Sequence, residues 1–370
     1  MPISFAGFSV AHITAVSNGR PTVFTTNRIQ SIRFVADPAI VPSCRVARLP
    51  LTVTGCPPSV YSLMQQWMDA VKEMKLQAGL ELTEEDYHRT GLVGERYTFI
   101  TTTLGNPAAK RTTCNPDMAA LAVELLHQAG VQPGDRVGGC FSGSFPAMNL
   151  AVLAACQALD VDCVYMTSVG ASTYGANQPE LTFPDMACRL YQASLLERPP
   201  VLITPGGDYD CGVEMDPELR SQVLTRAAGY GVPVMEEPDY EKNLRARMDI
   251  FQAEGALRCF VGVGGSIATQ GLEDDGIPCG VIQPGSLGAA SEKSGLLRRY
   301  SEQGLPVIHL LDIKRLVADY GLTFDPERLL PPGESAVYFK TVYPRWRAVL
   351  CLAGAAGTIW LGFRRLRREG

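Results

Sequence analysis

The sequence predicts an α/β fold, a mostly parallel sheet with helices on both faces, followed by a C-terminal transmembrane helix. Short apolar runs alternate with helical patterns over most of the chain, and such alternation is typical of parallel sheets that helices cover. Several of the runs end in Gly-rich turns, which let a ligand approach the backbone closely. With 370 residues, 46% of them hydrophobic, the chain can bury a substantial core.

Three parts are expected along the chain. Residues 1–56 show no sustained period and are either a poorly defined segment or a short β element. Residues 57–343 are assigned to the α/β domain, and residues 344–370 to a membrane anchor with a basic tail. Arginines are in excess at both ends, so the middle is more acidic than the net charge of −5 suggests. An acidic middle argues against nucleic acid as a partner and favours small substrates or proteins.

Two helices precede the centre of the predicted sheet. Residues 61–78 place apolar side chains on one helical face. Residues 91–105 follow as an extended segment rich in threonine. Asn115 and Pro116 then cap a helix over residues 117–129.

A strand–turn–helix–strand unit over residues 135–172 is the predicted centre of the molecule. Residues 136–141 form a small apolar strand, residues 142–144 a turn, residues 145–159 a helix and residues 163–168 a second strand. In a parallel sheet this turn lies at the carboxyl edge, where backbone N–H groups and the helix dipole favour a polar or anionic ligand. The functional site is therefore expected at this turn.

Further strands and helices are predicted beyond the central unit. The strands are residues 201–204, 232–236, 259–263, 279–283 and 306–311, and the helices are residues 183–195, 216–228 and 240–254.

Residues 348–363 carry no charge and are followed by four arginines. As a helix they are about 24 Å long, which is shorter than the hydrocarbon core of about 30 Å unless the flanking arginines snorkel. Aromatic residues at one end and arginines at the other predict a single-pass span with a cytoplasmic tail and an extracytoplasmic domain. A buried terminal helix is the alternative.

The turn suggests a serine nucleophile. Ser142, and Ser144 as a second candidate, lie between a strand and a helix, loosely like a nucleophile elbow. The chain order Ser142, Asp208, His309 matches that of an α/β-hydrolase triad. His309 lies inside an apolar strand, however, and a core histidine is the commoner reading of such a position.

A ligand cradle is the alternative reading of the same turn. Its hydroxyls, Gly143 and the following helix N-terminus resemble the phosphate cradle of sugar-isomerase-type domains, and Gly264 and Gly265 could form a second cradle. Lys110 and Arg111 are candidates for a substrate carboxylate.

An oxygen-rich metal site is a further alternative. Asp208 and Asp210 and the acidic residues 236–239 follow two strands, but their spacing fits no recognised loop. No metal site is assigned, and the sequence names no cofactor.

Several stretches together resemble one family, the poly-γ-glutamate system protein, which is found with the synthesis and export machinery of that bacterial polymer. They are residues 90–116, 142–155, 168–186, 206–212 and 260–268. The resemblance runs roughly from residue 76 to the C-terminus, and the apolar terminal segment with its basic tail also fits it. One departure is that residues 1–56 contain no apolar run long enough for an N-terminal anchor.

The resemblance implies a process rather than a reaction. We expect a membrane-anchored accessory protein of poly-γ-glutamate biosynthesis or export, for a capsule or a released polymer, with the synthase and export membrane proteins as partners. The turn would bind a small polar ligand or a chain end. The alternatives are a serine hydrolase or transferase acting on γ-glutamyl amide bonds and a phosphosugar-binding domain, so enzyme activity stays open.

The candidate site residues follow from these readings. The catalytic candidates are Ser142, Ser144, Asp208 and His309, and the ligand-binding candidates are Thr102, Thr103, Lys110, Arg111, Asn115, Gly143, Ser168, Asn177, Gly264 and Gly265.

Overall fold

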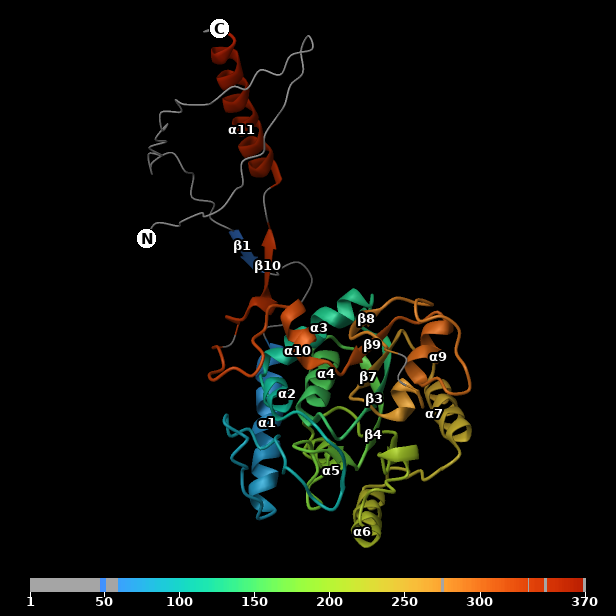
Figure 1. Ribbon diagram of the computed structural model, residues 1–370. Coiled ribbons are helices and arrows are strands. Elements are labelled where there is room, and N and C mark those ends of the chain that lie inside the picture. Colours follow the sequence, from blue (N-terminus) through green and yellow to red (C-terminus); the bar gives the residue numbers. More distant parts are fainter. Residues whose placement is uncertain (1–46, 51–58, 274–275, 332, 343–344, 369–370) are drawn as a thin grey trace, which may run out of the picture. The chain divides into compact units, whose positions relative to one another are not determined.

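A six-stranded sheet lies at the centre of the described chain (Figure 1). The structure is a computed structural model that describes residues 47–50, 59–273, 276–331, 333–342 and 345–368, all within the unit Ala47–Gly370. The strands in spatial order are β6 (Leu202–Thr204), β4 (Asp162–Ser168), β3 (Arg136–Phe141), β7 (Cys259–Val263), β9 (Val307–Leu310) and β8 (Gly280–Ile282). Five of them run parallel, and β8 pairs antiparallel with β9.

The central strands form where the sequence is continuously apolar and small. After their first residues, β3 and β4 are buried throughout, and every residue of β7 is buried. Gly138 in β3 is needed for close packing, since a Cβ there would lie 2.6 Å from Leu257 Cδ1. The rings of Phe141 and Tyr165 stack across β3 and β4 with centroids 5.3 Å apart. Such runs are typical of strands covered on both faces.

Helices cover both faces of this sheet (Figure 1). One apolar cluster joins the sheet to α1 (Ser59–Gln77), α3 (Asp117–Gln128), α4 (Pro146–Ala158), α5 (Phe183–Gln192) and α10 (Ile313–Asp319). A second cluster joins the other face to α7 (Tyr240–Glu254) and α9 (Leu296–Glu302). The alternation of side chains along β7, with Phe260 in the second cluster and Val261 in the first, shows the two faces. The predicted α/β architecture is confirmed.

One predicted strand does not form. Residues 232–236 make an isolated bridge, between Ile203 and Val234, beside the edge strand β6. Pro233 has no N–H to donate to a ladder, and Glu236 is exposed, so the run is too short and too polar for a full strand. The helix α6 (Pro217–Ala228) that precedes it agrees with the predicted helix.

Short elements complete the carboxyl edge of the sheet. The strand β2 (Thr101–Thr103) pairs in parallel with β5 (Ala171–Ser172). This pairing brings the threonine-rich segment and α2 (Pro107–Thr113) beside the segment that follows β4. The loop after β6 contains the short helix η1 (Asp208–Asp210), and the loop after β7 contains α8 (Ile267–Gln270).

The first and last strands of the described chain pair with each other. The strand β1 (Ala47–Pro50) pairs antiparallel with β10 (Phe339–Val342), which follows η2 (Ala336–Tyr338). The rest of residues 1–56, for which a poorly defined segment is predicted, lies outside the described residues. Residues 348–363 are helical within α11 (Arg345–Leu366). Among the residues that the structure describes, however, no helix combines the length and apolarity needed to cross a membrane.

Candidate functional site

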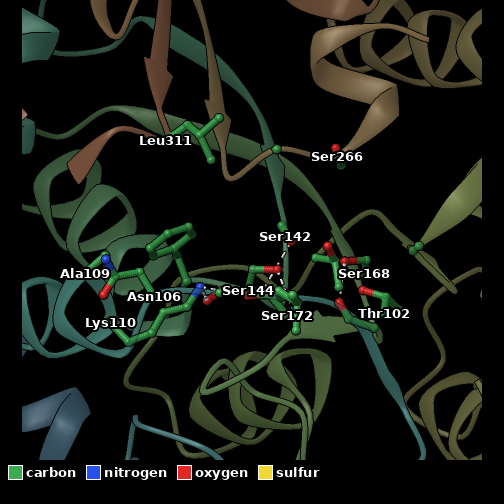
Figure 2. A pocket seen from close by; sticks show the side chains of 18 of the residues that line it. Thr102, Asn106, Ala109, Lys110, Ser142, Ser144, Ser168, Ser172, Ser266 and Leu311 are labelled. Atoms are coloured by element: carbon green, nitrogen blue, oxygen red, sulfur yellow. Dashed lines mark hydrogen bonds between the residues drawn. The ribbon is translucent and has the colours of Figure 1, made fainter. Parts of the chain in front are cut away.

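A cavity of about 610 Å³ opens at the carboxyl ends of the strands (Figure 2). It is lined by the segments that follow β3, β4, β6, β7 and β9, together with residues 102–106, 109 and 110. The chain moves from β3 outward to β4 and β6, and then returns to place β7 on the other side of β3. The strand order thus reverses between β3 and β7, and ligands of open α/β sheets bind at such a switch point.

The turn of residues 142–144 is held by serine hydroxyls and by Asn149. The backbone N–H of Ser144 donates to Ser142 Oγ at 3.1 Å, and that of Gly143 donates to Ser168 Oγ at 3.2 Å. The hydroxyl oxygen of Ser144 accepts from the backbone N–H of Ser172 at 2.9 Å. Asn149, in the first turns of α4, donates to the Ser142 carbonyl at 2.8 Å. The turn and the segment after β4 therefore form one hydrogen-bonded unit.

Lys110 reaches this unit from α2, as Figure 2 shows. Its side chain is buried, and its Nζ donates to the Ser144 carbonyl oxygen and, at 2.9 Å, to Ser172 Oγ. The Nζ atom also lies 3.4 Å from the ring centroid of Phe145. Within the described chain, the hydrogen-bond partners of this amine are a carbonyl and a hydroxyl, and none is a carboxylate. Burial therefore lowers the pKa of Lys110 to about 7.

Three acidic side chains line the cavity, two from the loop after β6 and one from the segment after β9. They are Asp208, Glu214 and Asp312. Glu214 Oε1 accepts from the backbone N–H of Asp208 at 2.6 Å, whereas Glu214 Oε2 is buried without a hydrogen-bond partner in the described structure. An unpartnered buried carboxylate oxygen is costly, so this wall favours a ligand that carries a hydrogen-bond donor or a positive charge.

The loop that presents Asp208 and Glu214 is fixed by a buried ion pair. Asp210 pairs with Arg247, and both side chains are buried. Asp210 also accepts from Thr204 Oγ1 at 2.8 Å and from Asn243 Nδ2 at 3.0 Å. Among the residues that the structure describes, no three His, Cys, Asp or Glu side chains cluster as metal ligands. Asp210 is thus a structural anchor of the loop.

Eight of the predicted site residues line the cavity. They are Thr102, Thr103, Lys110, Ser142, Ser144, Ser168, Asp208 and Gly265.

His309 is not part of this cavity, and the predicted triad does not assemble. Its Nδ1 lies 3.3 Å from the Pro278 carbonyl oxygen and its Nε2 lies 3.4 Å from Gln270 Nε2, beside a separate, smaller cavity. Its neighbours Ile308 and Leu310 pack in the first apolar cluster, so alternation along β9 turns His309 to the opposite face. Burial lowers its pKa, as expected for a histidine within the fold.

The remaining predicted residues support the site from outside the cavity lining. Arg111 is engaged by Asp325, through two hydrogen bonds of 2.7 Å, and by Glu85. It is therefore not a free cation for a substrate carboxylate.

Asn115 and Asn177 also have structural partners. The Oδ1 atom of Asn115 accepts from the Asp117 N–H at the start of α3. Asn177 is fully buried, and its amide bonds to both backbone groups of Glu95 and to Thr101 Oγ1.

Gly143 and Gly264 lie where neighbouring atoms leave no room for a Cβ. A Cβ on Gly143 would lie 2.8 Å from the Gly170 carbonyl oxygen. Gly264 has a φ of +85°, and a Cβ there would lie 2.8 Å from Ser142 Cβ.

Sequence reasoning missed several lining residues. Ser172 belongs to the predicted central stretch, but its role depends on Lys110, which lies 62 residues away in the chain. Glu214, Ser266, Asp312 and Lys314 also line the cavity. Asp312 and Lys314 lie at the start of a helix with no motif around them. Glu214 and Ser266 follow Gly-rich turns, and these turns were the signal in the sequence that could have indicated them.

Comparisons with known proteins add no family. No family model matches the chain, and no curated protein matches it. Two crystal structures of 2-hydroxyisobutyryl-CoA ligase, one in an open conformation with 2-HIB-AMP and CoA and one in the postadenylation state with R3-HIB-AMP, are each 14% identical in sequence to this chain. They match over 56% and 58% of this chain and 43% and 44% of the ligase, with TM-scores of 0.15 and 0.16. The match thus spans less than half of the ligase, and at such scores it carries no argument.

Proposed function

We propose that the cavity binds the amino end of a γ-glutamyl chain, and that the protein is an accessory component of poly-γ-glutamate biosynthesis or export. The observation that carries the proposal is the chemistry of the wall. Hydroxyls of Ser142, Ser144 and Ser168 line one part, whereas the carboxylates of Asp208 and Glu214 line another. A chain end carries an ammonium group for the carboxylates and carboxylate and amide groups for the hydroxyls.

Charge favours a chain end over the interior of the polymer. Each interior γ-linked residue carries a free carboxylate, which the acidic wall repels. Two lysines line the cavity, and of these Lys110 is buried whereas Lys314 is exposed. Lys314 lies on the first turn of α10. It offers a partner for one carboxylate near the rim.

Membrane attachment is part of the same proposal. Its support is the sequence resemblance together with α11, where Val349, Leu352, Trp360, Leu361 and Phe363 are exposed. We place the α/β domain outside the cell, the basic tail in the cytoplasm and α11 at the membrane, with the synthase and export proteins as partners. No described helix meets the requirement for a span, so the test is fractionation. Full-length protein should sediment with membranes and a chain ending at residue 343 should not.

Calorimetric titration of the full-length protein tests the ligand. A γ-linked glutamate trimer with a free amino end should bind, and its N-acetylated form should bind at least about tenfold more weakly, because it lacks the ammonium group. Glu214→Gln keeps the shape of the wall and should weaken only the free trimer. Asp249→Asn, which alters an exposed residue of α7 outside the cavity, is the matched control.

Two outcomes would contradict this function. Equal affinity for the free and acetylated trimers would remove the chain-end proposal. Tighter binding of a hexose phosphate than of either trimer would favour the phosphosugar alternative, with residues 142–144 as its phosphate cradle.

A further inference from the structure

Lys110 and Ser172 form a contact that no predicted role explains. The Nζ atom lies 2.9 Å from Ser172 Oγ, within the range for proton transfer between a base and a hydroxyl. Both residues line the cavity, yet only 2% and 3% of their surfaces are exposed. A hydroxyl and an amine are thus held together in a protected place that a ligand can reach.

Both partners are fixed by further contacts. Lys110 is held by the Ser144 carbonyl and by the ring of Phe145. Ser172 is held through its backbone, which donates to Ser144 Oγ and lies opposite Thr103 in the pairing of β5 with β2. A nucleophile, a base and a group that orients the base are the parts of an activated serine.

Burial favours the neutral amine of Lys110. Lys110 is desolvated, and the Cys114 thiolate, which would raise the pKa of Lys110, is disfavoured because burial raises the pKa of Cys114 to about 12. The acids Asp208, Glu214 and Asp312 line the same cavity, but among the described residues the hydrogen bonds of the amine go to Ser144 and Ser172 instead. A neutral amine has a lone pair that can accept the hydroxyl proton, whereas an ammonium ion does not.

The two serines of the turn, Ser142 and Ser144, are less suited to attack than Ser172. Ser142 Oγ and Ser144 Oγ each accept a backbone N–H, and neither is in hydrogen-bond contact with an amine or an imidazole in the described structure. Ser172 is the serine of the three whose hydroxyl contacts a base.

We propose that Lys110 and Ser172 form a serine–lysine pair that transfers an acyl group from an amide or ester of a small polar carboxylic acid. Ser172 Oγ attacks the acyl carbon, and its proton passes to Lys110 Nζ. When the bond from carbon to the leaving nitrogen or oxygen breaks, that atom takes the proton back from Lys110. An ester on Ser172 remains. Water, or a second amine, then attacks this ester, Lys110 takes its proton, and Ser172 Oγ leaves with that proton.

This inference requires the cavity to be a ligand site, but not the identity of the polymer. Trimer binding without an active serine would leave the proposed function standing and remove the pair. An active serine without trimer binding would do the reverse.

A fluorophosphonate probe tests the pair on the full-length protein. The product is located by mass spectrometry of the intact chain and of its peptides. A single adduct on Ser172 is expected, and Ser172→Ala and Lys110→Met should lower the labelling rate by about 100-fold or more. The controls are Ser301→Ala and Lys75→Met, which alter a buried serine and a buried lysine outside the cavity.

If Lys110→Met does not fold, the pH dependence of the labelling rate of the unaltered protein tests the proposal. The labelling rate should rise about tenfold per pH unit below 7 and level off above it, because Lys110 must be neutral to act as base. No adduct, an adduct on Ser142 or Ser144, or a rate that does not change with pH would overturn the proposal. Labelling of folded Lys110→Met at the unaltered rate would overturn it equally.

Discussion

Lys75 and Lys110 are two lysines with the same burial and different surroundings. Their exposed fractions are 1% and 2%, and burial lowers the pKa of each. Lys75 donates to the Val93 carbonyl at 3.1 Å, and the nearby charges of Asp86 and Glu95 oppose the lowering of its pKa. Lys110 meets the hydroxyl of Ser172 in a cavity. Burial alone thus makes a lysine weakly basic. A hydroxyl and an open cavity beside the amine are what allow the neutral amine to act as a base on a ligand.

Arg247 is a third buried cation and can be compared with the two lysines. It pairs with a buried carboxylate, that of Asp210. Asp210→Ala should destabilise the protein by about 3–5 kcal/mol, since it leaves the guanidinium buried and unpaired. Urea unfolding measures the loss. Glu273→Ala removes the partner of exposed Lys293 and should cause no measurable change. Equal small effects in both variants would show that partners of buried cations matter little here.

The pH dependence of the free energy of unfolding should reveal the contribution of Lys110 apart from that of the other titratable groups. The folded-state pKa of Lys110 is about 7, below the value of an unfolded lysine, so between these values the unfolded state binds the extra proton. The free energy of unfolding should therefore rise with pH from 7 to 9, by up to about 2.7 kcal/mol relative to Lys110→Met. The contribution of Lys75 cancels in that difference. A difference that stays constant from pH 7 to 9 would contradict the account.

The support of the serine turn should depend on Gly264. Gly264→Ala adds a Cβ at a φ of +85° and 2.8 Å from Ser142 Cβ, and should cost about 1–3 kcal/mol. The matched control is Gly285→Ala, where φ is +71° and nothing lies within 4 Å. Thermal unfolding of the two variants separates the strain in φ from the clash. Equal losses of stability in the two variants would show that the turn at Ser142 accommodates the added Cβ without a clash.

The sheet was largely predictable because its central strands are continuous apolar runs. The bounds of β3 and β7 agree with the predicted residues 136–141 and 259–263. The failure at residues 232–236 has a local reason, the proline within the run. Residues 348–363 of the predicted transmembrane segment are helical, but no helix among the described residues meets the length and apolarity of a membrane span.

The site was predictable in place but not in chemistry. A strand followed by Ser142 and Ser144 indicates the carboxyl edge of a sheet, and the cavity lies there. The order of Ser142 and His309 in the chain carries no information on the face of β9 to which the histidine turns. The meaning of Lys110 depends on a pairing of β2 with β5 that brings Ser172 beside it, and sequence spacing does not show such tertiary contacts.

The proton state of Lys110 is the claim on which the comparison of the two lysines rests. Nuclear magnetic resonance of protein labelled with ¹³C at lysine Cε measures it directly, with Lys75→Met and Lys110→Met assigning the two signals. The account predicts that Lys110 titrates near pH 7 and that its signal shifts when a fluorophosphonate occupies Ser172. A Lys110 signal that titrates like an exposed lysine, near 10.4, would contradict it.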